Sequence, residues 1–135
     1  MLNVSGMRVS YGQTEVLHGL NFAVAPGEIV AVMGRNGMGK STLMKSLMGI
    51  VPTRAGTVSV GDTQITRMAT HQRVQKGIAY VPQGRMIFGT MTVKENIETG
   101  LFVRVENKVP EDIYDLFPVL LEMQARRGEI GRAHV

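Results

Sequence analysis

The sequence predicts an α/β fold built around a phosphate-binding turn, and three consecutive features carry this prediction. Residues 29–33 form a continuous apolar run, which is typical of a strand buried on both faces of a sheet. A glycine-rich loop follows over residues 34–39. Apolar residues then recur at helical spacing over residues 41–50. Strand, loop and helix therefore occur in the order that a phosphate-binding turn requires.

Shorter elements are expected on both sides of this turn. The remaining predicted strands lie at residues 2–9, 16–24, 57–65 (a hairpin) and 78–81. The remaining predicted helices lie at residues 67–76, 92–101 and 110–124. Thr92 and Glu95 match a capping box at the start of the second of these helices, and Pro110 suits the first turn of the third.

The composition narrows the classes of function. The chain has 135 residues, a formal net charge of +4 and no cysteine, which excludes disulfides and thiolate metal sites. Its basic residues are scattered, so we expect a solvated surface and no nucleic-acid partner. No apolar run approaches the roughly 18 residues of a membrane span, and the first residues show no signal peptide. We expect membrane contact only through partner proteins.

The strongest motif is Gly34-x-x-x-x-Gly39-Lys40-Ser41, which matches the phosphate-binding loop pattern at every fixed position. Gly34, Gly37 and Gly39 let backbone N–H groups face phosphate oxygens. Lys40 supplies a point charge for the β- and γ-phosphates, and the Ser41 hydroxyl can ligate Mg²⁺. The alternative is an accidental glycine-rich turn, for which a chance match is on the order of one in a hundred.

Further segments extend this motif into a family resemblance. The loop, with Tyr11 and Gly12 ahead of it and residues 80–83 behind it, resembles the ATP-binding subunits of ABC transporters. Residues 34–40, 45–49, 80–85, 87–88 and 116–120 are most similar to the subunits for urea and branched-chain amino acid uptake, those for urea above all. The resemblance covers residues 1–128.

The resemblance implies a P-loop NTPase of the ABC ATPase type. This α/β fold would have an antiparallel β subdomain and a RecA-like core within residues 1–83, and the start of a helical subdomain over residues 84–128. It implies ATP and Mg²⁺ as cofactors, and the permease subunits of an importer and a second ATP-binding subunit as partners. It also implies a peripheral location on the cytoplasmic face of the inner (plasma) membrane.

The same resemblance gives individual residues their roles. Tyr11 is expected to stack on adenine, and residues 84–102 to contact the permease. Gln83 is expected to reach Mg²⁺ and the attacking water, and to couple the nucleotide to the permease. Lys40 and Gln83 are thus the predicted catalytic residues, and Ser41 and Gln83 the metal ligands. The predicted nucleotide-binding residues are Tyr11, Gly34, Asn36, Gly37, Gly39, Lys40, Ser41 and Thr42.

Departures from the family pattern suggest a truncated domain. Gly89 stands where relatives commonly have proline. After a position like Arg127 the family continues into a signature motif, a strand ending in Asp-Glu and a switch histidine, none of which this sequence contains. We therefore expect a partial ATP-binding domain that is inactive alone. We also expect it to be unstable or to aggregate, because the resemblance implies that strands from beyond residue 135 lie in the sheet between the strands at residues 29–33 and 78–81, and a sheet without them leaves backbone groups and apolar faces unpaired. Residues 129–135 are expected to be a non-native tail, since DNA resembling a sequencing adapter can encode residues 130–135.

Two other functions remain open at this point. Another P-loop enzyme, such as a GTPase or small kinase, would use the same loop. The nearest match to a guanine-binding motif is at residues 107–110, where proline replaces the required aspartate. A non-catalytic nucleotide-binding module is the other alternative, because the signature motif, the Asp-Glu pair and the switch histidine of the family are not in the sequence.

Overall fold

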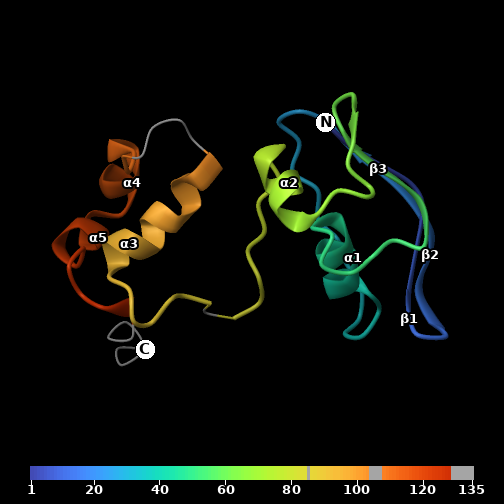
Figure 1. The fold of residues 1–135 in the computed structure, drawn as a ribbon, viewed down its shortest axis with the longest axis horizontal. Helices are drawn as coiled ribbons and strands as arrows, with labels where there is room; N and C mark the ends of the chain where they lie inside the picture. The colour runs from blue at the N-terminus through green and yellow to red at the C-terminus, as the bar shows by residue number, and fades with distance from the viewer. Residues whose placement is uncertain (85, 104–107, 129–135) are drawn as a thin grey trace. The chain divides into compact units, whose positions relative to one another are not determined.

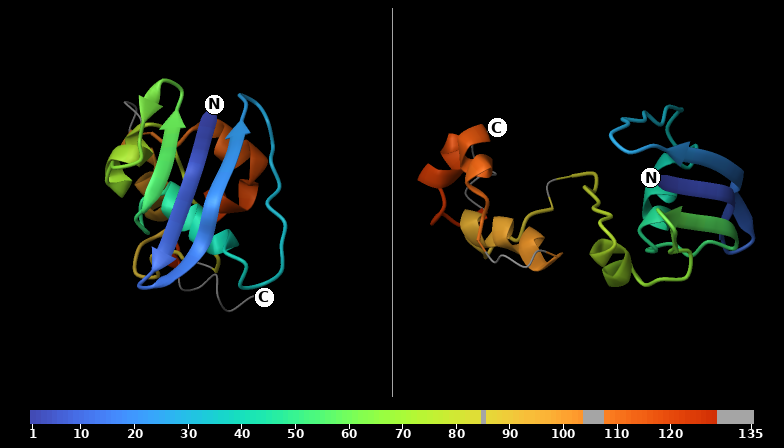
Figure 2. Two further views of the ribbon diagram at one scale, coloured as in Figure 1. Left: turned by 90° about the vertical axis from the view of Figure 1, so that its right-hand side faces the viewer. Right: turned by 90° about the horizontal axis from the view of Figure 1, so that it is seen from above.

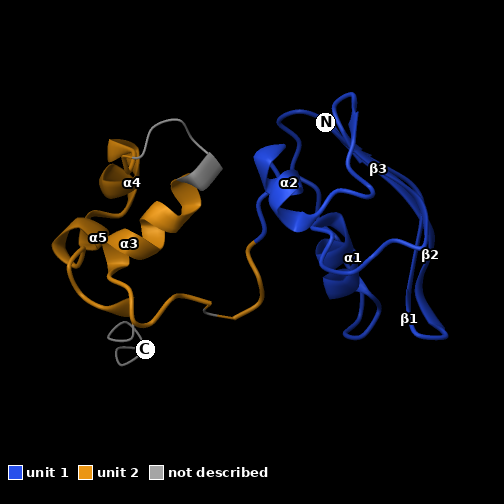
Figure 3. Cartoon of the chain, in the orientation of Figure 1, with its two compact units in different colours: residues 1–80 blue, residues 81–135 orange. Residues whose placement is uncertain are grey.

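The computed structural model describes residues 1–84, 86–103 and 108–128, with the side chains of residues 102 and 103 excepted. The chain divides into two compact units, Met1–Tyr80 and Val81–Val135, shown in different colours in Figure 3. The placement of one unit relative to the other is not determined, so each is described by itself.

The first unit contains a four-stranded antiparallel sheet (Figure 1). Its strands are β1 (Leu2–Tyr11), β2 (Thr14–Val24), β3 (Ala55–Val60) and β4 (Thr63–Gln64), in the spatial order β2-β1-β3-β4. The hairpin predicted at residues 57–65 is confirmed by the pairing of Ser59 with Gln64 across β3 and β4. The strands predicted at residues 2–9 and 16–24 pair with each other, with Val4 opposite Phe22 across β1 and β2. This sheet is the antiparallel β subdomain that we expected.

Helix α1 (Lys40–Leu47) lies against one face of the sheet, as Figures 1 and 2 show. The apolar residues that alternate along the strands meet Leu43 of α1 there, and together they bury the main core of the unit. Its buried members are Val4, Met7, Val9, Leu17, Leu43, Val51, Val58 and Ile65. This core fixes α1 against the sheet.

The two strands predicted at residues 29–33 and 78–81 were wrong for this structure. Neither segment has strand pairing, and Ile29, Met33 and Val81 are 98%, 90% and 92% exposed. Apolar sequence alone does not make a strand, because each strand needs backbone partners to satisfy its N–H and C=O groups. Among the described residues the sheet ends at β2 and β4, and neither edge pairs with these segments.

The helices are shorter than the sequence predicted. In the first unit, α2 spans Thr70–Gln75. In the second unit, α3 (Val93–Glu98) continues as a 3-10 helix (Thr99–Val103). The single helix predicted at 110–124 was wrong: α4 (Glu111–Leu116) ends at Leu116, and α5 (Pro118–Glu122) begins after Phe117. Pro118 has no N–H to continue α4 and instead occupies the first position of α5.

In the second unit, the first residues of α3 form hydrogen bonds to segments on both sides of the helix. Backbone N–H groups of Val93 and Lys94 donate to the carbonyls of Arg126 and Gln124, at 2.8 and 3.0 Å. The side chain of Asn96 accepts from the N–H of Phe88 at 2.8 Å and donates to the Phe88 carbonyl at 3.0 Å. No helix in the described ranges has the length and apolar character to cross a membrane.

Candidate nucleotide-binding site

The predicted loop lies directly before α1, and two of its glycines adopt backbone angles that other residues avoid. Gly37 has a φ of 84° and Gly39 a φ of 93°. Positive φ is strained for residues that carry a Cβ atom. These angles turn the chain sharply into α1, for which Gly39 is the N-cap residue. The sequence prediction of a tight turn at this point is confirmed.

Gly39 has a second constraint that the motif does not reveal. A Cβ atom at this position would lie 2.9 Å from Cδ2 of Leu17 and 3.2 Å from Cγ1 of Val16. The side chains of Val16 and Leu17 in β2 therefore pack closely against the end of the loop. Sequence reasoning missed Val16 and Leu17 because their contact with Gly39 joins residues that are distant along the chain.

Lys40 extends back across the loop. Its ammonium group donates to the carbonyl of Gly34 at 2.6 Å and to the carbonyl of Arg35 at 2.8 Å. Both bonds join the first residue of the helix to the beginning of the loop. The positive charge of Lys40 is thus held over the backbone that the motif predicts to face phosphate.

The amino end of α1 presents a group of backbone donors. Gly39 provides no side-chain cap, and the first helical hydrogen bond runs from the N–H of Leu43 to the carbonyl of Gly39 at 2.8 Å. Within residues 1–84, 86–103 and 108–128, the N–H groups of Lys40, Ser41 and Thr42 donate to no protein acceptor. Such donors at the positive end of a helix favour an anion.

The three other predicted loop residues differ in exposure. Ser41 is exposed, so its hydroxyl is accessible beside Lys40. Thr42 is buried, and a role in binding would rest on its backbone N–H. Asn36 is exposed in the loop.

A groove with a volume of about 570 Å³ runs along the loop and the edge of β2. One wall comes from the loop and from the start of α1, including Gly37, Gly39 and Lys40. The other comes from β2, where Glu15 and His18 contribute polar groups. The groove therefore combines a cationic loop with a strand edge of mixed character.

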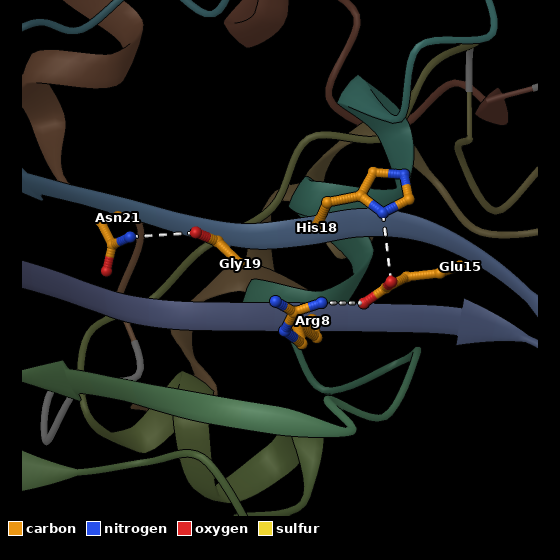
Figure 4. Close-up of polar contacts among 5 residues, drawn as sticks. All are labelled: Arg8, Glu15, His18, Gly19 and Asn21. Atoms are coloured by element: carbon orange, nitrogen blue, oxygen red, sulfur yellow. Dashed lines mark hydrogen bonds and ion pairs between the residues drawn. The ribbon is translucent and has the colours of Figure 1, made fainter.

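Polar residues on β1 and β2 form a small network that Figure 4 shows. The carboxylate of Glu15 lies 3.0 Å from Nη1 of Arg8 and 3.2 Å from Nδ1 of His18. The hydrogen bond from Arg8, followed by that from His18, holds the pKa of Glu15 below its ordinary value. In the same view Asn21 donates to the carbonyl of Gly19 at 3.0 Å.

Tyr11 lies at the tip of the β1–β2 hairpin in the same unit as the loop. It is 49% exposed and pairs with Thr14 across the turn. It does not line the groove described above. Its stacking on adenine stays a prediction.

Gln83 belongs to the second unit and is exposed. The loop belongs to the first unit, so no distance between Gln83 and Ser41 follows from this structure. The predicted roles of Gln83 in catalysis and in metal binding stay predictions.

Sequence reasoning also missed Arg73, which anchors the far end of α1. Its side chain is 2% exposed, and burial lowers the pKa of its guanidinium group, which nevertheless stays protonated. Its carbonyl partners are Met68, Ser46, Leu47 and Thr66, at 2.9, 2.9, 2.8 and 2.7 Å. A cation at the carboxyl end of a helix is favourable to the helix dipole.

Comparison with known proteins identifies the family. A model of the ABC transporter family matches residues 17–132. The chain belongs to this family. Its fold class is therefore that of an ABC ATPase, as predicted. The match ends within residues 129–135, whose non-native origin stays a prediction.

The ABC chain has curated relatives of several kinds. It is 32% identical to the probable branched-chain amino acid transport ATP-binding protein LivF of Archaeoglobus fulgidus. It is 34% identical to the high-affinity branched-chain amino acid transport ATP-binding protein BraG of Pseudomonas aeruginosa. Both alignments cover 95% of this chain and 56% of the relative. The ribose import ATP-binding protein RbsA of Oceanobacillus iheyensis is 41% identical over 67% of this chain and 18% of the relative.

A solved structure described as an ATP binding subunit of an ABC transporter has the same fold. It matches with a TM-score of 0.76 and 25% identity, over 100% of this chain and 55% of the other. The ABC chain spans about half the length of the curated LivF and BraG relatives.

Proposed function

We propose that this ABC chain binds the triphosphate of ATP with residues 34–41, as an ATP-binding subunit of an importer. The observation that carries the proposal is the amino end of α1, where the N–H groups of Lys40, Ser41 and Thr42 have no protein acceptor within the described ranges. A triphosphate supplies the acceptors that these donors require. Membership of a family of ATP-hydrolysing cassettes supports the choice of ATP.

Each group of the loop has a defined task in this proposal. Gly37 and Gly39 hold the turn in a shape that brings backbone N–H groups to the phosphates. Lys40 exchanges its bonds to the carbonyls of Gly34 and Arg35 for bonds to phosphate oxygens. This exchange keeps the ammonium group hydrogen-bonded both with and without ATP, and it neutralises charge on the phosphates.

The residues at hand fit a nucleotide-bound magnesium ion. Among the described residues no three carboxylate or histidine side chains converge on a common metal position. Mg²⁺ at ATP sites is held largely by phosphate oxygens and waters with one or two protein ligands. The exposed hydroxyl of Ser41, one residue after Lys40, is the ligand that we assign to it. When bound, the ion neutralises charge on the phosphates.

Tyr11 and Gln83 complete the proposed site. The exposed ring of Tyr11 offers a flat surface on which adenine can stack without a hydrogen-bond code. Gln83 would add its amide to Mg²⁺ and to the attacking water, and would link the nucleotide to the permease. Both assignments rest on the sequence resemblance.

The proposed transport role is import of a small organic nitrogen compound, either urea or a branched-chain amino acid. The names of LivF and BraG support this class, and the sequence resemblance of residues 34–40 and 80–85 favours urea. The proposed partners are permease subunits and a second ATP-binding subunit, on the cytoplasmic face of the inner membrane. Through these partners, ATP binding and hydrolysis would drive transport.

Calorimetric titration tests the proposal at its first step. The unaltered chain should bind Mg²⁺–ATP, and Lys40→Ala should weaken the affinity at least about a hundredfold, because a charge-assisted contact to phosphate is lost. Lys45→Ala, which removes an exposed lysine of the same helix, is the matched control and should keep the affinity. Equal binding by Lys40→Ala and the unaltered chain would refute the proposed site.

A further inference from the structure

The tip of the β1–β2 hairpin is paired on one side only. Along β1, the pairing with β3 ends at Arg8, whose partner is Ala55. The pairing with β2 continues for three more residues, as far as Tyr11 and Thr14. The last part of β1, which carries Tyr11, therefore lacks the second neighbour that holds the rest of the strand.

Arg54 directly precedes Ala55, the first residue of β3, and its side chain extends toward this tip. Its backbone N–H donates to the carbonyl of Arg8 at 2.8 Å, which fixes the start of its side chain beside β1. Its Nη2 atom donates to the carbonyl of Gly12 at 3.3 Å. One residue thus bonds the hairpin at two points, the carbonyls of Arg8 in β1 and of Gly12 in the turn, which stand before and after the segment that β3 leaves without a partner.

The second contact point is adjacent to Tyr11. Gly12 has a φ of 57° and Gln13 has no positive φ, the pattern of a type II′ hairpin turn with glycine at its first central position. The carbonyl of a central turn residue takes no part in the strand ladder, so a side-chain donor can bind it. Tyr11 is 49% exposed and directly precedes Gly12, so the position of the turn influences where its ring lies.

We propose that Arg54 is a positioning residue for the nucleotide base, holding the Gly12 carbonyl so that the ring of Tyr11 is presented to adenine. The inference rests on the proposed function. Arg54 touches neither base nor phosphate in this account, and its effect passes through Gly12 to Tyr11. Its contribution should therefore depend on the presence of the base and of the tyrosine ring.

The test compares ATP with inorganic tripolyphosphate, which offers the loop the same phosphates but no base. Arg54→Met keeps the aliphatic part of the side chain and removes the donor. It should weaken ATP binding about fivefold, as expected for one hydrogen bond, and leave tripolyphosphate binding unchanged. Arg67→Met, at an exposed arginine elsewhere in the first unit, is the matched control and should change neither affinity.

A double substitution checks the route through Tyr11. With Tyr11→Ala already in place, Arg54→Met should cause no further loss of ATP affinity, because no ring remains to be positioned. Thermal unfolding of each variant shows that it is folded, and Arg54→Leu provides a second variant without the donor should the methionine variant not fold. Only a positioning role predicts that the loss vanishes both without the base and without the ring.

Three outcomes would overturn the inference. An unchanged ATP affinity in Arg54→Met would do so, as would an equal loss for ATP and tripolyphosphate, which would indicate a general charge effect. A full loss in the Tyr11→Ala background would show a role independent of the ring. Failure of the unaltered chain to bind either ligand is a different result: it rejects the phosphate-binding loop itself, and the inference with it.

Discussion

The amino ends of α1 and α3 differ in whether the protein supplies acceptors for their first N–H groups. Each helix begins with N–H groups that have no partner within the helix. At α3 every donor of the first turn is satisfied by the protein: Val93 and Lys94 by distant carbonyls, Glu95 by the side chain of Thr92, and Asn96 by the Thr92 carbonyl. At α1, in the part of the chain that the structure describes, residues 40–42 have no such acceptors.

This difference in acceptors distinguishes the amino end of α3, which is structural, from that of α1, to which we assign binding. The capping box of Thr92 and Glu95 closes α3, so an anion there would have to displace protein groups. Gly39 cannot cap α1, and its contact with Leu17 leaves no room for a residue that could. The lack of a side-chain cap at Gly39 therefore lowers the stability of α1 as an isolated helix. It also leaves the N–H groups of residues 40–42 available to an external acceptor.

The largest expected effect concerns the other end of α1, since the comparison requires that this helix be held firmly. Arg73→Met would leave four backbone carbonyls without their common donor in a buried place. We expect a loss of about 3 kcal/mol in the free energy of unfolding, measured with urea. Arg67→Met should cost under about 0.5 kcal/mol. A loss below about 1 kcal/mol for Arg73→Met would show that Arg73 does not anchor α1.

The next effect should arise at the open amino end itself. Gly39→Ala places a Cβ at a φ of 93° and 2.9 Å from Leu17, so both strain and overlap oppose it. We expect a loss of about 2 kcal/mol in unfolding free energy together with weaker ATP binding. Gly77→Ala has a similar φ of 90° but meets no atom within 4 Å, and should cost less. Equal losses in the two variants would remove the role assigned to Leu17.

The closed end of α3 should depend on its cap to a smaller extent. Thr92→Ala removes the acceptor for the N–H of Glu95, 3.1 Å away, and should cost about 1 kcal/mol in unfolding free energy. Thr99→Ala, at the carboxyl end of the same helix, is a suitable comparison because it removes a hydroxyl that caps no N–H group. A neutral Thr92→Ala would mean that the distant carbonyls alone close this helix end.

At the open amino end of α1 we expect the reverse: a change of the Lys40 side chain should affect ATP binding and leave the stability almost unchanged. Lys40→Met should alter the unfolding free energy by less than about 0.5 kcal/mol, because its two carbonyl partners lie in an exposed loop. The same variant should lose ATP binding. Urea unfolding and calorimetry on one sample provide both values. Strong destabilisation would indicate that Lys40 is a structural cap and weaken the comparison.

The smallest effect is a pH dependence at the closed end. The N–H of Thr92, and then its hydroxyl, hold the pKa of Glu95 below its ordinary value. A lowered pKa in the folded state means that the carboxylate stabilises α3 above its unfolded pKa, and that this is lost as the pH falls through the folded pKa. Glu95→Gln should remove this acid sensitivity. An NMR titration of the carboxyl group that gives an ordinary pKa would contradict this.

The sequence predicted those parts of the molecule that depend on local chemistry. The turn at residues 34–41, the hairpin at residues 57–65 and the capping box at Thr92 all follow from residues close together along the chain, and the structure confirms them. Strands at 29–33 and 78–81 were wrong because a strand depends on partners elsewhere, which apolar sequence does not supply. Pro118 was a local signal that the helix prediction should have used.

The contacts that position the site could not be predicted from pattern alone. Arg73 bonds carbonyls up to 27 residues away, and Arg54 reaches Gly12 across 42 residues. Nothing in the spacing of an isolated arginine indicates which backbone carbonyls it will meet. Such contacts become visible only when the sheet has brought α1 and the hairpin together.

An NMR titration tests most directly whether the amino end of α1 is the binding end. Backbone amide signals are followed while Mg²⁺–ATP is added to the ¹⁵N-labelled chain. We expect large, saturable shifts for the amides of residues 40–42, with those of residues 93–95 unmoved. Saturable binding that shifts other amides but leaves residues 40–42 in place would contradict it.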